Sequence, residues 1–328
     1  MRSTKTPIHP LQTHEWAQFR REWGNEVLET KYGVVTIHRI PVTGHGIGMF
    51  IKGPRPSQQM LTDLKEIAQK HNLIFIKLEP NFPVSTNHQS LVTSHSREKL
   101  LQLLRSNGCV EGKTLFTPTT FWIDLRRPEI DILKSFSGKT RYNIRLAQKH
   151  GVKISEDDSD KAFEKYLELT FETTNRQGFY AHTPKYHRLM WKHLHRTPIT
   201  EHRSPLAHLL VAKYKGEIIT TWILFVYDKV LYYPYGASSD KYKSVMANNL
   251  MMWEAIQFGK HLGCKAFDLW GREPGKGFTK FKEGYNPEVV GFLGSWDLIT
   301  SPLYKIYKIA EFLRWLILKT QAKLNLTT

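Results

Sequence analysis

The sequence predicts an α/β protein made of two similar halves. Its 328 residues suffice for two ordinary domains, and a hydrophobic fraction of 41% with 23% charged residues is typical of a globular chain. Apolar runs of strand length alternate with segments whose apolar residues recur every three or four positions. Each half has helices first, strands in the middle and a helix before a late strand, an order that predicts tandem copies of one fold.

The first half opens with a helix over residues 14–23, where Trp16, Phe19 and Trp23 share one face. The segment 73–78 has the composition of a buried strand and is apolar except for Lys77. The other predicted elements are strands at 32–41, 48–52 and 119–124 and helices at 57–70 and 96–107.

The second half repeats the alternation, beginning with a helix near 129–150. Its later helix, over 245–262, places Leu250 and Trp253 on one apolar face. The other predicted elements are helices at 159–175 and 184–196 and strands at 152–155, 207–214, 217–227, 229–235, 266–270 and 289–297.

A terminal helix is predicted over 301–321, where apolar residues alternate with lysine and arginine. Such a helix either docks on the first half or lies on a membrane surface, and the pattern favours docking. Its most apolar stretch, from Trp315 to Leu318, is far too short to span a bilayer.

The formal net charge of +17 indicates which partners to expect. A strong positive charge concentrates polyanions, which include nucleic acid, nucleotide diphosphates and anionic lipid headgroups. The alternative is that the charge serves only solubility or reflects a basic proteome.

The cysteines and histidines favour neither disulfides nor a metal site. Cys109 and Cys264 are far apart, and we expect two buried, reduced thiols. His193 and His195 lack further ligands at zinc-binding spacing, so we expect exposed helix histidines. The N-terminal residues lack the apolar core of a signal peptide, which predicts a soluble, cytoplasmic protein.

Four sequence blocks stand out when they are considered together. The first is the basic segment 136–152, and the second is Tyr235-Gly-Ala-Ser-Ser239. The third joins Phe267-Asp-Leu-Trp-Gly271 to the segment 277–285, and the fourth is Lys52-Gly-Pro-Arg55. Each block alone is weak, but the four in this order resemble the FemABX family of non-ribosomal peptidyltransferases, and their order makes the resemblance specific.

The resemblance implies two GNAT-like domains, the second inserted in the first. Domain one would comprise residues 1–128 and 300–328, and domain two residues 129–299. No sustained heptad run predicts the coiled-coil arm of longer members, so the chain is similar to the compact type often called FemX. The compact type modifies UDP-MurNAc-pentapeptide, whereas longer members use lipid II, and the sequence leaves both acceptors open.

The implied reaction moves an amino acid from aminoacyl-tRNA to a stem-peptide amine of a peptidoglycan precursor. An ester is already activated, so neither a protein nucleophile nor a cofactor is expected, and we expect a monomer. By resemblance, Lys282 stabilises the developing oxyanion or the leaving ribose oxygen, and Phe281 stacks on the terminal adenine. The alternative for this pair is a core aromatic residue beside a solvated lysine.

Further substrate contacts also come from the resemblance. Arg20 falls where the compact type has a lysine for the UDP diphosphate, and His182 replaces an arginine four residues before the shared Tyr186. Histidine is only partly charged at neutral pH, which puts that contact in doubt. Tyr235 is either a hydrogen-bond donor to substrate or a packed strand residue.

Three basic residues, Arg141, Arg145 and Lys149, recur every four positions in the predicted helix near 129–150. This stripe either tracks the tRNA backbone or is an ordinary solvated face. Asp268 ends a strand beside a glycine-rich loop, and the sequence assigns it no role.

One motif favours a different donor. Arg272-Glu-Pro-Gly-Lys-Gly277 fits the pattern with which GNAT acetyltransferases hold the pyrophosphate of acetyl-CoA. That motif requires a helix directly after it, and we expect none over 278–285. An acyl-CoA-dependent acetyltransferase and a non-catalytic RNA-binding protein remain the alternatives to an aminoacyltransferase.

Overall fold

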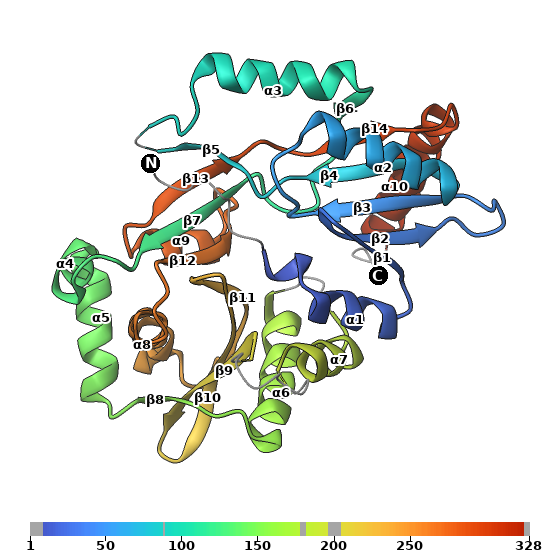
Figure 1. Cartoon of the computed structure of the whole chain (residues 1–328). Helices are drawn as coiled ribbons and strands as arrows, with labels where there is room; N and C mark the ends of the chain where they lie inside the picture. The colour runs from blue at the N-terminus through green and yellow to red at the C-terminus, as the bar shows by residue number, and fades with distance from the viewer. Residues whose placement is uncertain (1–8, 88, 178–181, 196–204, 325–328) are drawn as a thin grey trace.

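The computed structural model of the chain describes residues 9–87, 89–177, 182–195 and 205–324. Two β-sheets lie side by side, and helices cover both of them (Figure 1). The chain is thus the mixed α/β protein that the sequence predicts. No coiled-coil arm is found in the described part of the chain.

The six-stranded sheet belongs mainly to the first half of the chain. Its strands in spatial order are β1 (Glu26–Thr30), β2 (Gly33–Arg39), β3 (Gly46–Ile51), β4 (Leu73–Glu79), β14 (Trp296–Ile299) and β6 (Cys109–Glu111). Helix α2 (Gln58–Lys70) packs its buried face on this sheet together with α3 (Ser94–Ser106). The lysine of the buried strand, Lys77, is neutralised by Asp297 of β14, whose carboxylate lies 2.5 Å from the ammonium.

The eight-stranded sheet belongs mainly to the second half. Its strands in spatial order are β5 (Pro83–Thr86), β13 (Glu288–Phe292), β7 (Thr119–Asp124), β12 (Ala266–Gly271), β11 (Val230–Ser238), β10 (Glu217–Tyr227), β9 (Ala207–Tyr214) and β8 (Lys153–Glu156). Strand β7, which the predicted boundary assigns to domain one, therefore lies in this sheet, whereas β14 returns to the six-stranded sheet. The domain limits themselves stay a prediction.

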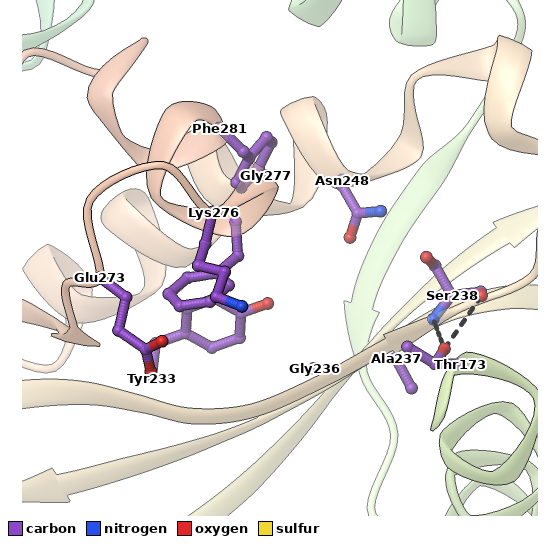
Figure 2. A pocket seen from close by; sticks show the side chains of 11 residues that line it. Thr173, Tyr233, Gly236, Ala237, Ser238, Asn248, Glu273, Lys276, Gly277 and Phe281 are labelled. Carbon is purple, nitrogen blue, oxygen red and sulfur yellow. Dashed lines mark hydrogen bonds between the residues drawn. The ribbon is translucent and has the colours of Figure 1, made fainter. Parts of the chain in front are cut away.

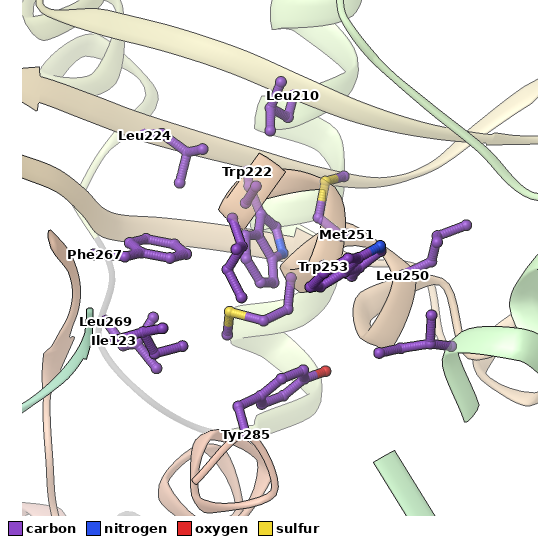
Figure 3. Close-up of a cluster of buried hydrophobic side chains, with 14 of the residues drawn as sticks. Ile123, Leu210, Trp222, Leu224, Leu250, Met251, Trp253, Phe267, Leu269 and Tyr285 are labelled. Carbon is purple, nitrogen blue, oxygen red and sulfur yellow. The ribbon is translucent and has the colours of Figure 1, made fainter. Parts of the chain in front are cut away.

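Alternate residues of the eight-stranded sheet feed two different cores, because neighbouring strand residues point to opposite faces. Leu210 and Trp222 face the core formed with α4 (Glu129–Ser135), α5 (Gly138–Lys149) and α8 (Ala247–His261), shown in Figure 3. Leu209 and Ile223 face the opposite core, formed with α6 (Asp160–Gln177), α7 (Pro184–Leu194) and α1 (His14–Glu22). Helix α1 also packs on β1, so it joins the two sheets (Figure 1).

Strands β11 and β12 pair over only part of their length. Their parallel ladder joins residues 230–232 to residues 266–268, and it does not continue into the last residues of β11. The end of β11 leads through η2 (Lys243–Val245) into α8, and the end of β12 leads through a loop into α9 (Gly277–Glu283). This divergence leaves room between the two strands at their carboxyl ends.

Two predicted elements are wrong because each is really two. The helix expected near 129–150 is α4 and α5, separated where Phe136 takes an extended conformation and Ser137 caps the second helix. The strand expected at 289–297 is β13 and β14, which lie in different sheets on either side of Gly294, whose φ is +96°. The short strands β5 and β6 were not predicted, because three or four residues carry little periodicity.

The terminal helix, α10 (Tyr304–Leu324), docks on the six-stranded sheet at its beginning. Tyr304 and Tyr307 pack against Phe75 of β4 with ring centroids 5.3 Å apart in both pairs. A second side of the helix bears Ile306 and Ile309, which are 64% and 62% exposed. Docking is therefore confirmed for the first turn, and an apolar strip remains in solvent. Among the described residues, no helix has the length and apolar character needed to cross a bilayer.

Candidate active site

A cavity of about 420 Å³ lies at the junction between the six-stranded sheet, α1, α7 and β11, and we call it the junction cavity. Four residues predicted to bind substrate line it together: Arg20, His182, Tyr186 and Tyr235. They come from three parts of the chain, which the packing of α1 on α7 brings together. The remaining lining includes residues of β2 and β3, so both sheets contribute to its wall.

Hydrogen bonds and stacking order the polar side of the junction cavity. The Tyr186 side chain is hydrogen-bonded to both Tyr235 and Arg20. The His182 ring stacks on Tyr186 with centroids 3.8 Å apart. Desolvation, and secondarily the charge of Arg20, lower the pKa of His182, so its imidazole is neutral at pH 7. Arg20 is therefore the charged member of this group.

A second cavity, of about 810 Å³, lies where β11 and β12 diverge, and we call it the strand-gap cavity. Tyr233, Phe278 and Phe281 supply aromatic rings to its lining, and Lys276 supplies a cation. Figure 2 shows Phe281 of α9 and Lys276, which directly precedes this helix, with Ser238 and Thr173 across the cavity from them. The Phe281 ring, which was predicted to stack on an adenine, therefore borders open space as well as the core.

Lys282 contacts the walls of both cavities. Its Nζ atom donates to the carbonyl oxygens of Gly271 at 3.1 Å and Trp270 at 3.4 Å. Trp270 is also one of the residues that line the junction cavity. The same ammonium lies 5.1 Å from the ring centroid of Phe278 and 5.8 Å from that of Tyr233, which line the strand-gap cavity. Lys282 is the predicted catalytic residue, and its ammonium contacts residues that line both cavities.

The environment of Lys282 changes its protonation. Burial lowers the pKa of the Lys282 ammonium to about 8, although Asp268 and Glu273 act in the opposite direction. A lysine with this pKa is still about nine-tenths protonated at pH 7. It can therefore act as a cation that faces a developing negative charge, or pass a proton to a leaving oxygen.

The basic stripe of α5 is only partly available to a ligand. Arg145 and Lys149 are exposed. Arg141 instead donates to the backbone carbonyls of Lys134 and Phe136, which end α4. The structure thus gives Arg141 a structural task at the junction of the two helices, and the stripe lies apart from the residues that line the two cavities.

Comparison of the sequence with known proteins decides the family. The profile of the FemAB family matches residues 3–196. The chain belongs to the FemAB family. A profile described as an acetyltransferase (GNAT) domain matches residues 134–283, which span α5, β11, α8 and α9.

Relatives of this FemAB-family chain are distant in sequence. It is 20% identical over 318 residues to "Lipid II:glycine glycyltransferase" of Staphylococcus haemolyticus, covering 76% of this chain and 74% of the relative. The protein of the same name from Staphylococcus epidermidis is 21% identical over 317 residues, with the same shares covered. The names of these relatives and the GNAT profile identify the chain as a transferase of acyl or aminoacyl groups.

Solved structures confirm the fold of the FemAB-family chain. The structure described as "Crystal structure of FemX" superposes with a TM-score of 0.76 at 16% identity, covering 92% of this chain and 95% of that one. L-PGS from Bacillus licheniformis superposes with a TM-score of 0.55 at 13% identity, covering 94% and 97%. The prediction of GNAT-like architecture is confirmed.

The motif Arg272-Glu-Pro-Gly-Lys-Gly277 requires a correction, because helix α9 begins at Gly277. We predicted that no helix follows the motif, and this is wrong. A helix of seven residues shows too few repeats for its period to be recognised in the sequence. Lys276 and Gly277 also line the strand-gap cavity, so the motif borders the place where a donor would lie.

The histidines and cysteines have ordinary protein environments. His193 and His195 are half-buried rather than exposed, bonded to Glu22 and to the Ala207 carbonyl respectively. Both cysteines are free and buried, as predicted. Burial raises the pKa of Cys109 to about 12 and that of Cys264 to about 11, so neither is a ready thiolate nucleophile.

One group of possible metal ligands was not apparent from the sequence. Ligand atoms of Glu156, Asp158 and His208 lie within 4.8 Å of one another. His208 Nδ1 lies 2.6 Å from Glu156, its Nε2 lies 3.1 Å from the Pro205 carbonyl, and Asp158 accepts from the Leu209 amide at 2.9 Å. Protein groups thus already satisfy these atoms, and the spacing along the chain gave no signal.

Proposed function

We propose that this protein transfers an amino acid from aminoacyl-tRNA to a stem-peptide amine of a peptidoglycan precursor. The observation that carries the proposal is that the Lys282 ammonium contacts lining residues of both cavities. It donates to the carbonyl of Trp270, which lines the junction cavity, and lies over the rings of Phe278 and Tyr233, which line the strand-gap cavity. The names of the distant relatives, lipid II:glycine glycyltransferases, support the same class of reaction.

The donor would occupy the strand-gap cavity. Its aromatic lining suits the terminal adenine of tRNA, which can stack on Phe281, and Lys276 suits the adjoining phosphate. The ester carbonyl would then reach Lys282 at the wall of the cavity. Exposed Arg145 and Lys149 on α5 offer charge to the more distant tRNA backbone.

The acceptor would occupy the junction cavity. Arg20 would pair with a phosphate group, while neutral His182 and the Tyr186–Tyr235 pair would supply hydrogen bonds. A phosphate is present both in UDP-MurNAc-pentapeptide and in lipid II, so the two acceptors share this contact. We favour the UDP-linked acceptor because the chain shares the compact architecture of the structure described as FemX, on which it superposes with a TM-score of 0.76.

The transfer needs no covalent enzyme intermediate and no cofactor. The neutral acceptor amine attacks the ester carbonyl, and a C–N bond forms as the carbonyl oxygen becomes anionic. The Lys282 ammonium stabilises this oxyanion. The C–O bond to the ribose then breaks, and the ribose oxygen takes up the proton that the amine releases, either directly or through Lys282.

The terminal helix suggests a further partner, an anionic membrane surface. Ile306, Ile309 and Leu313 share one side of α10 and are 64%, 62% and 52% exposed. Lys305 and Arg314 are exposed on either flank of this strip. An apolar strip between cations is the arrangement of a helix that lies in the interface of a bilayer.

A second candidate, an acyl-CoA-dependent acetyltransferase, is favoured by the GNAT profile and by α9 following the Arg272–Gly277 motif. Both candidates place the donor in the strand-gap cavity. The experiment that separates them incubates the protein with mixed charged tRNAs or with acetyl-CoA, and with UDP-precursor or lipid II, followed by mass spectrometry of the acceptor. An aminoacyl mass increase with tRNA supports the proposal, and an acetyl increase with acetyl-CoA alone overturns it.

The Phe281→Ala variant tests the donor position in the same assay. Loss of stacking should weaken use of charged tRNA by roughly 1–3 kcal/mol. Binding of the UDP-precursor should not change, because Phe281 lies outside the junction cavity.

A further inference from the structure

Asp268 is a buried carboxylate in β12, and its side chain is 5% exposed. It accepts three hydrogen bonds: from the Thr120 hydroxyl at 2.5 Å, from Trp122 Nε1 at 3.0 Å and from the Trp270 amide at 2.8 Å. Two of these donors belong to the neighbouring strand β7, and the third lies two residues ahead in the same strand. The carboxylate is therefore fixed from both sides.

The hydrogen bond from the Trp270 amide to Asp268 stabilises an uncommon backbone conformation at Trp270. Trp270 has a φ of +62°, which is in the left-handed region and unfavourable for a large residue. The pairing of β12 with β7 also shifts register between Asp268 and Gly271. Because the carboxylate binds the Trp270 amide, it stabilises this turn in the place where the ladder is interrupted.

The turn determines what Lys282 can contact. The carbonyl oxygens of Trp270 and Gly271 are the acceptors for the Lys282 ammonium. Both belong to the segment that Asp268 bends. If Trp270 took an ordinary strand conformation, these two carbonyl groups would point in other directions. The Lys282 ammonium would then lose the two acceptors that fix its position.

Charge adds a second connection. The groups that affect the protonation of Lys282 are Asp268 and Glu273, both of which favour its charged form. The charge of Asp268 also acts on Lys52, a half-buried lysine whose ammonium lies over the Phe292 ring, and on the Tyr232 hydroxyl. Buried His9, beside Trp270, has a pKa lowered by desolvation and by Lys52, so it adds no positive charge there at neutral pH.

We infer that Asp268 is a positioning residue, which aligns Lys282 through the left-handed turn at Trp270 and supplies a negative charge opposite its ammonium. The inference rests on the proposed function for the part that concerns transfer. The alignment of the lysine is a property of the protein alone and can be measured without substrate.

The test compares Asp268→Asn with a matched control, Asp124→Asn. Asp124 lies on β7 as Thr120 and Trp122 do, but it is bonded to exposed Arg126 at the surface. Labelling of Lys282 by acetic anhydride, followed over pH by mass spectrometry, reports its protonation. We expect the labelling midpoint of Asp268→Asn to fall by about one pH unit. The midpoint of Asp124→Asn should stay at the native value.

Transfer kinetics give the second readout. Asp268→Asn should lower kcat on the order of a hundredfold through misalignment, with KM for both substrates little changed. Coincident labelling curves for Asp268→Asn and the native protein would overturn the inference. If Asp268→Asn does not fold, the double variant Asp268→Asn/Trp270→Gly is used, because glycine adopts positive φ without strain. Its labelling midpoint is then compared with that of the single variant Trp270→Gly. Failure of the native protein to transfer from any charged tRNA would reject the proposed function and leave the labelling result standing.

Discussion

The Tyr186 side chain is hydrogen-bonded to Tyr235, which joins the first turn of α7 to β11 across the junction cavity. The two residues are far apart in the sequence, and Arg20 reaches the same tyrosine from α1. The polar side of this cavity is therefore built by three elements, and the contribution of each can be tested separately.

Replacing Arg20 should affect nucleotide binding more than replacing His182. UDP should raise the melting temperature of the native protein, because a ligand that binds only the folded state stabilises it. Arg20→Met should abolish most of this increase at pH 7.5. His182→Gln should retain it, because the native imidazole is already neutral. A native protein that shows no increase in millimolar UDP, yet modifies lipid II in micelles, would contradict the UDP-linked acceptor.

Lys282→Met should lower the transfer rate on the order of a hundred- to a thousandfold, the usual effect of losing one preorganised oxyanion donor. The methionine keeps most of the aliphatic stem, so affinity for the UDP-precursor should change little. Single-turnover transfer from charged tRNA measures the rate directly. A folded Lys282→Met variant that transfers at the native rate would show that the lysine is structural.

The same substitution should change how stability depends on pH. The pKa of Lys282 is about 8 in the folded chain, below the ordinary lysine value of 10.5. The unfolded chain therefore binds more protons between these pH values, and the stability of the native protein rises with pH across that range. Burial of the charged Lys282 side chain destabilises the folded state by about 3 kcal/mol, and this destabilisation is fully present below pH 8.

Urea denaturation at pH 7 and at pH 10 measures this difference. Other lysines and tyrosines titrate in the same range, so the comparison is between the native protein and Lys282→Met. The variant should be more stable than the native protein at pH 7, and the gap should shrink at pH 10. A gap that is equal at both pH values would mean that the folded lysine keeps its ordinary pKa.

Much of the fold was predictable because its longer elements have clear periods. Strands β9 and β10 match the expected limits, since their apolar runs end at turn residues. The sequence could not reveal that β14 returns to the first sheet, because this depends on its pairing with β4. Nor could it reveal the left-handed turn at Trp270, since a tryptophan there has no intrinsic preference for positive φ.

The residues of the candidate site could be predicted only through the family resemblance. Arg20, His182, Tyr186 and Tyr235 were named from separate segments, and the structure places them in one cavity. The task of Arg141 was missed, because its carbonyl partners appear only once the helix is known to break before Ser137. The role inferred for Asp268 was missed for a related reason, since two of its three donors lie on another strand.

Binding of tRNA should depend on salt through the exposed basic residues of α5. Arg145→Ala/Lys149→Ala leaves Arg141 in place, because that side chain supports the end of α4. The slope of log affinity against log salt should become shallower by about two, one for each phosphate that no longer meets a cation. The control Arg97→Ala/Lys99→Ala removes equal charge from exposed positions of α3. Equal slopes for the two double variants would return the α5 stripe to an ordinary solvated face.

Contact with a membrane should depend on the apolar strip of α10. Ile306→Ser/Leu313→Ser removes two exposed side chains without touching Tyr304 and Tyr307, which dock the helix. Each isoleucine or leucine buried in a bilayer contributes roughly 1.5–3 kcal/mol, so loss of two should lower partition into vesicles by at least about a hundredfold. Sedimentation with vesicles of anionic and of zwitterionic lipid measures this, and the native protein should prefer the anionic ones because Lys305 and Arg314 flank the strip. Ile130→Ser, at an exposed position of α4, is the control. Native protein that stays in the supernatant with both lipids would show that the strip serves another partner.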